Sequence, residues 1–156
     1  MRKITVLILA GILAVAVTGT LAAQNQPDIA GQRAAIQKDR NSIVAASLPL
    51  TTDQTTTFWP LYKEYRADMV KVGDRMEKLI RDYAAGYNTT LTDEQAAALL
   101  KEFLAIQKEA LKVREQYVPR FSAILPAKSV MRFYQIENKL DASVTADLVS
   151  QVPLAK

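Results

Sequence analysis

The sequence predicts an all-α, elongated four-helix antiparallel hairpin or cradle, with two long kinked helices and shorter first and last helices. Glycine and proline are sparse, with five and six copies in 156 residues. Apolar residues recur in steps of four and three over long stretches, which is the spacing of one helix face. No stretch alternates between apolar and polar residues as strands do. A chain of this length suits one domain.

Residues 1–23 have the three parts of a secretory signal peptide. Arg2 and Lys3 supply the positive start, residues 4–17 form an uncharged apolar run, and small residues precede a cleavage site after Ala22 or Ala23. An uncleaved membrane anchor is the alternative, but the run is short for the roughly 20 residues that a bilayer requires. We therefore predict export and cleavage, with no stable membrane insertion afterwards.

The remainder of the chain is expected to form one helical domain over residues 32–149. Residues 24–31 are polar, hold a proline and predict a flexible lead-in, and residues 150–156 predict a loose tail. The first helix is predicted over 32–48, and Ile29, Ile36 and Ile43 recur every seven residues in and just before this range. Pro49 ends it, because proline cannot donate to the helical ladder.

The second helix is predicted over 52–85 and shows the clearest periodicity. At 1.5 Å per residue it would be about 50 Å long, which makes the molecule elongated. Pro60 should kink it, and Gly86 should close it in a left-handed cap. Its stripe comprises Phe58, Tyr62, Tyr65, Met69, Val72, Met76, Leu79 and Tyr83.

The third helix begins at Thr92 and is apolar over a wide face, so we expect it to have more than one neighbour. Pro119 should bend it and Pro126 should end it; a fourth helix follows over 127–149. An elongated, thin arrangement of helices cannot cover both apolar stripes of the third helix within one chain. We therefore predict a symmetric homodimer. One stripe holds Ala96, Leu99, Phe103, Ile106, Ala110, Val113 and Tyr117, and the other holds Leu104, Leu111, Val118 and Leu125.

A five-residue pattern, L-T-x-x-Q, occurs twice, once before each long helix. In such a capping box the threonine hydroxyl accepts a bond from the amide three residues on, and the glutamine side chain returns a bond to the threonine amide. A single box indicates only that a helix begins. The two copies consist of Leu50, Thr51 and Gln54, and of Leu91, Thr92 and Gln95.

This pair of boxes, in an exported chain without histidine, resembles the Spy/CpxP family of periplasmic stress proteins, which is named for a twofold LTxxQ motif. The resemblance extends from about residue 32 to 145. It implies a cradle-shaped helical dimer in the periplasm that binds unfolded or misfolded envelope proteins without ATP. The alternative that it implies is a regulator of a sensor kinase or an anti-sigma factor, and a metal-responsive protein is the third alternative.

Composition excludes several classes of function. The chain has neither cysteine nor histidine, so it lacks thiolate nucleophiles, the commonest general base and the usual ligands of soft metals. We predict no enzymatic activity, no cofactor and no metal site. The net charge is +4, and cleavage would remove Arg2 and Lys3, so a nucleic-acid partner is not expected.

Client binding remains as the expected chemistry, through adaptable apolar area bordered by positive charge. The alternative is that the aromatic residues are buried between helices, and the sequence leaves this open for Trp59 and the basic residues. The candidate surface comprises Phe58, Trp59, Tyr62, Tyr65, Arg66, Met69, Lys101, Lys108, Lys112 and Arg114.

Overall fold

The computed structural model describes residues 39–149 and 152–155, and every regular element in these ranges is helical. A first helical segment covers residues 39–47. It is followed by α2 (Thr52–Tyr87), α3 (Asp93–Ser122) and α4 (Ala127–Val149). The prediction of an all-α fold is therefore confirmed. The signal peptide, the lead-in and the start of the first helix lie outside the described residues.

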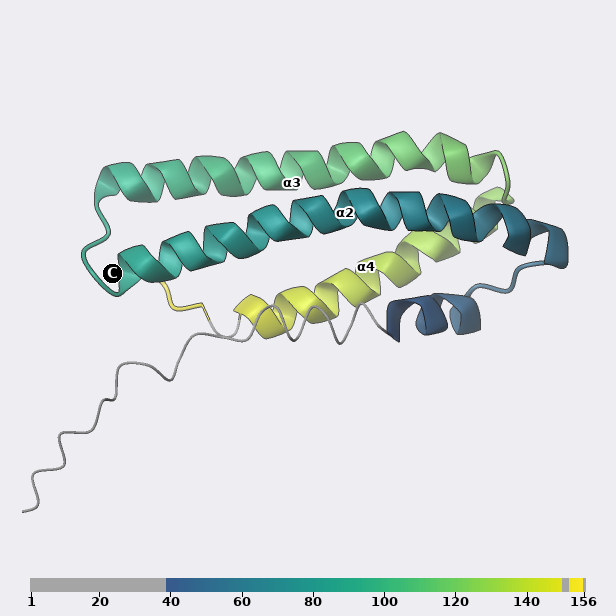
Figure 1. Ribbon diagram of the computed structural model, residues 1–156, viewed down its shortest axis with the longest axis horizontal. Helices are drawn as coiled ribbons and strands as arrows, with labels where there is room; N and C mark the ends of the chain where they lie inside the picture. The colour runs from purple at the N-terminus through teal and green to yellow at the C-terminus, as the bar shows by residue number, and fades with distance from the viewer. Residues whose placement is uncertain (1–38, 150–151, 156) are drawn as a thin grey trace, which may run out of the picture.

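The two long helices, α2 and α3, lie antiparallel and in contact, and α4 packs against both of them, with backbone contacts to α3 and side-chain bonds to α2 (Figure 1). With 36 residues, α2 is about 54 Å long. Both long helices contain a proline, Pro60 in α2 and Pro119 near the end of α3, and each helix continues through it. The bend expected at each proline stays a prediction.

Both helix starts are set by the repeated motif. The Gln54 amide donates to the Thr51 hydroxyl at 3.3 Å, and the Thr51 amide donates to the Gln54 side chain at 3.0 Å. Thr92 and Gln95 make the same two bonds at the same two distances. These bonds satisfy amides that the first helical turn leaves without partners, so each long helix begins one residue after its threonine.

The prediction for Gly86 is wrong. The helix continues through Gly86 to Tyr87 and ends on Asn88 in a right-handed conformation, and no described residue has a positive φ. A Cβ added at Gly86 would lie 2.8 Å from Cδ1 of Leu91. The missing side chain at Gly86 therefore lets the loop residue Leu91 approach closely, and a Cβ there would make this flexible side chain shift. At the other end of α3, the helix ends at Ser122, four residues before Pro126, in a turn closed by the Leu125 amide on the Phe121 carbonyl at 2.9 Å.

The core lies at the end of the molecule where all four helical segments meet. Phe58 of α2, Phe121 of α3 and Phe133 of α4 are fully buried, and the Phe121 and Phe133 ring centroids are 4.5 Å apart. Val44 of segment 39–47 and Leu48, which follows that segment, belong to the same cluster. The opposite end of the α2–α3 hairpin, hereafter the tip, has neither α4 nor segment 39–47 beside it (Figure 1).

Candidate binding surface

Four of the residues predicted for a client-binding surface are core residues. Phe58, Tyr62, Tyr65 and Met69 are at most 9 % exposed. They follow the four-three spacing of α2, and that stripe packs against α3 and α4, where aromatic rings exclude water most effectively. The prediction that they form a surface is therefore corrected, in favour of the alternative of burial.

Trp59 is half-buried, and its ring packs edge-on against Phe58 at 5.2 Å between centroids. The two predicted arginines are engaged in ion pairs: Arg66 donates to Glu137 at 3.0 Å, and Arg114 donates to Asp141 at 3.0 Å. Both therefore serve in the packing of α4 onto the hairpin, and neither presents its charge as the free surface that the sequence suggested.

The predicted lysines do lie on an open surface. Lys101, Lys108 and Lys112 are exposed along α3. Four large apolar side chains lie alongside them on the same helix, with exposed fractions between 42 and 60 %. We call these residues the α3 stripe: Leu100, Leu104, Leu111 and Val118. Three of them belong to the second apolar stripe expected from the sequence, whereas its last member, Leu125, is buried.

A buried ion cluster ties segment 39–47 to the other helices, and sequence reasoning missed it. Glu137 of α4 is 1 % exposed and accepts from Arg40 at 2.8 Å, from Arg66 at 3.0 Å and from the Tyr62 hydroxyl at 2.9 Å. Arg40 also donates to Asp141 at 2.9 Å. The only signal in the sequence is a carboxylate at an apolar-stripe position of the last helix.

The cluster shifts the titration of its members. Burial, followed by the Glu137 carboxylate, raises the pKa of Tyr62 well above its ordinary value. Burial alone would lower the pKa of Arg40, but Glu137 and Asp141 outweigh it and the pKa is raised. Both groups therefore stay in their ordinary protonation states at neutral pH. The ion cluster therefore links segment 39–47 to α2 and α4 electrostatically.

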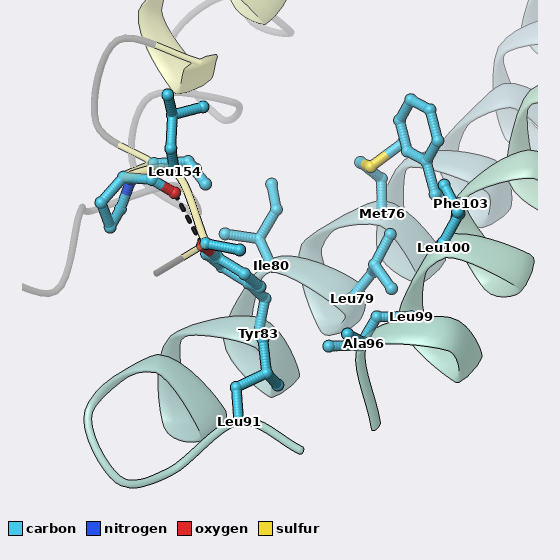
Figure 2. A pocket seen from close by; sticks show the side chains of 13 residues that line it. Met76, Leu79, Ile80, Tyr83, Leu91, Ala96, Leu99, Leu100, Phe103 and Leu154 are labelled. Carbon is cyan, nitrogen blue, oxygen red and sulfur yellow. Dashed lines mark hydrogen bonds between the residues drawn. The ribbon is translucent and has the colours of Figure 1, made fainter. Parts of the chain in front are cut away.

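An apolar groove of about 430 Å³ opens at the tip, away from the ion cluster (Figure 2). One wall is formed by α2 and α3, and the other by residues 152–155, which are not helical. The Tyr83 hydroxyl donates to the Pro153 carbonyl at 2.8 Å, so the described part of the tail, predicted to be loose, lies against α2. We call this the tip groove, and its main hairpin residues are Met76, Ile80, Tyr83, Leu99, Leu100 and Phe103.

Sequence reasoning missed the groove as a site, although most of its hairpin residues belong to the predicted stripes. Within the described ranges, no group of three or more acidic side chains could hold a metal ion. None of the described helices is long and apolar enough to cross a bilayer. Comparison with protein-family models, with curated proteins and with solved structures gave no match.

Proposed function

We propose that the chain is an exported, ATP-independent holdase that binds unfolded envelope proteins along the α3 stripe, as its resemblance to the Spy/CpxP proteins implies. One observation carries this proposal: α3 buries one apolar face in the core and leaves a second, lysine-bordered apolar face open. Exposed apolar area of this kind marks an interaction surface more often than chance placement.

The geometry of the stripe suits loose and unspecific recognition. Leu100 and Val118 are about 27 Å apart along the helix, and the stripe offers apolar contacts separated by polar positions. An unfolded chain can contact several of them without a fixed register. The neighbouring lysines attract acidic segments over a distance of about 10 Å at ordinary salt, which raises the encounter rate before apolar contact forms.

The central experiment measures aggregation of a denatured client that is diluted into buffer with an equimolar amount of the purified chain, followed by light scattering. The wild type should suppress scattering. The double variant Leu104→Ser/Leu111→Ser should need at least tenfold more protein for the same effect, because two half-exposed leucines each lose about 1 kcal/mol of apolar contact. Lys108→Glu should slow the suppression and make it less dependent on salt.

A matched control is Met131→Ser on α4, since Met131 is 61 % exposed and lies outside the α3 stripe. It should behave as the wild type does. Circular dichroism checks that all variants keep their helix content. Failure of the wild type to suppress aggregation would exclude the holdase and favour the regulatory alternative.

A homodimer, also expected from the sequence, would use the same open face of α3. Sedimentation of the wild type and of the Leu104→Ser/Leu111→Ser variant distinguishes the two occupants. If the variant loses dimerisation but keeps full client protection, the stripe is a dimer interface and the proposed client surface is wrong. Export is tested separately: protein recovered from the envelope should begin at Ala23 or Gln24.

A further inference from the structure

The tip groove is unusual because part of its wall is a short segment from the far end of the chain. Val152, Pro153, Leu154 and Ala155 carry no charge and are not helical, and they lie beside apolar residues of α2 and α3 (Figure 2). We call residues 152–155 the C-terminal segment. The segment of this chain that lies against the tip is thus an irregular, uncharged, apolar peptide.

The contact that fixes the C-terminal segment does not depend on its side chains. The Tyr83 hydroxyl donates to the backbone carbonyl of Pro153, a group that every peptide presents. Leu154 is 89 % exposed, so its side chain does not fill the groove and the apolar cavity beside it stays open. The groove therefore pairs one backbone-directed donor with an apolar floor, as peptide-binding sites do.

The C-terminal segment is held weakly enough to be exchanged. The hydrogen bond from Tyr83 is solvent-exposed, and exposed bonds contribute little because water replaces them readily. Segments with few buried apolar contacts open at the lowest free-energy cost in a folded protein. A competing peptide must still overcome the advantage of an intramolecular partner, whose effective concentration is on the order of millimolar.

We propose that the tip groove is a binding site for extended, uncharged apolar peptide segments, and that the C-terminal segment, which covers one side of it in the resting protein, is displaced by a client segment. Leu100 belongs to both the groove and the α3 stripe, so a client lying on the stripe reaches the groove without leaving the helix. This inference rests on the proposed function, and it adds an internal competitor to the client-binding surface.

Peptide binding tests the proposal without any client. The probe is a capped peptide with the sequence Val-Pro-Leu-Ala, titrated into the full-length chain and into a chain that ends at residue 151. The shortened chain should bind at least tenfold more tightly, because the internal competitor is gone. In the shortened chain, Tyr83→Phe should weaken binding about fivefold, because the donor to the peptide carbonyl is lost while the ring remains. Ile80→Ser should weaken it further, and Met131→Ser should have no effect.

Displacement is measured directly with spin labels. The sequence contains no cysteine, so Ala155→Cys and Thr90→Cys in one chain give two unique labelling sites, one on the C-terminal segment and one in the exposed loop between α2 and α3. The distance between the labels should be short and narrowly distributed in the resting protein. Denatured client should broaden and lengthen it. If the chain that ends at residue 151 loses helix content, a full-length variant with residues 152–155 all replaced by serine takes its place in the peptide titration.

The outcomes separate this proposal from the holdase. Equal peptide affinity of the full-length and shortened chains, or label distances that client leaves unchanged while aggregation is suppressed, would overturn the role of the C-terminal segment and leave the holdase intact. Tighter peptide binding by the shortened chain, with no suppression of aggregation by either chain, would support the groove and reject the holdase.

Discussion

Replacement of Glu137 by glutamine should remove much of the stability of this protein. The side chain keeps its shape but loses the charge that balances Arg40 and Arg66, both held within 3.0 Å of Oε2. Loss of one partner from a buried ion pair costs about 3–5 kcal/mol, because the remaining charge stays desolvated. Asp141 still compensates Arg40 at 2.9 Å, so we expect the lower end, about 3 kcal/mol. That is a large part of the roughly 5–15 kcal/mol of a typical domain.

The measurement is urea-induced unfolding, followed by the fluorescence of the single tryptophan, Trp59, and by circular dichroism. The matched control is Glu102→Gln. Glu102 accepts from Arg75 at 2.9 Å, but both side chains are over 40 % exposed, so the change should cost less than about 1 kcal/mol. If the two variants lose similar free energies of unfolding, the charges of the buried cluster do not stabilise the fold through one another, and this reasoning is wrong.

Three further predictions concern local features. Thr51→Ala and Thr92→Ala should each lower the free energy of unfolding by about 1 kcal/mol, and the double variant should show additive losses in urea titrations because the caps are distant. Gly86→Ala should stabilise α2 by about 1 kcal/mol in a chain that also carries Leu91→Ala. As a single substitution it should stabilise α2 by clearly less, because the new methyl group meets Leu91 Cδ1. A double-mutant cycle measures the difference between the two effects. The buried Tyr65 hydroxyl has no hydrogen-bond partner among the described residues, so Tyr65→Phe should raise stability by about 1 kcal/mol at neutral pH. Burial raises the pKa of Tyr65 above its ordinary value, so above about pH 10 the hydroxyl ionises in the unfolded chain before it does in the folded one. The free energy of unfolding should therefore fall by about 1.4 kcal/mol per pH unit above that pH in the wild type. It should fall less steeply with pH in Tyr65→Phe, which lacks this hydroxyl.

Local patterns sufficed to place the helices. Each capping box is closed by residues three apart, so Thr51 and Thr92 could be identified as helix starts without knowledge of the tertiary structure. The sustained four-three spacing gave the lengths of α2 and α3, since such a stripe is useful only if the helix continues beneath it. The range predicted for the last helix, residues 127–149, agrees with α4 for the same reason.

Contacts between distant residues could not be predicted in this way. Arg40 and Glu137 are 97 positions apart, and no spacing rule pairs them. Tyrosine is amphipathic, so the sequence was compatible with Tyr62 either at a solvent-exposed surface or in the core. Its burial depends on the Glu137 carboxylate of α4, which accepts the hydrogen bond of its hydroxyl. Gly86 was assigned a left-handed cap from its local context, whereas its close neighbour in the structure is the loop residue Leu91. In each case the deciding partner lies outside the window that a local pattern covers.

The proposed client-binding residues and the stabilising core lie on the same two long helices. A protein that exposes apolar side chains for clients loses the burial that those side chains would have contributed to folding. In this chain the exposed apolar side chains are those of the α3 stripe and the tip groove, while the aromatic core and the Glu137 cluster lie where four helical segments meet. Because α2 and α3 are continuous through both regions, the core end holds the hairpin in register for the tip. Under the proposed function, this anchoring would let the C-terminal segment leave the tip without the whole molecule unfolding.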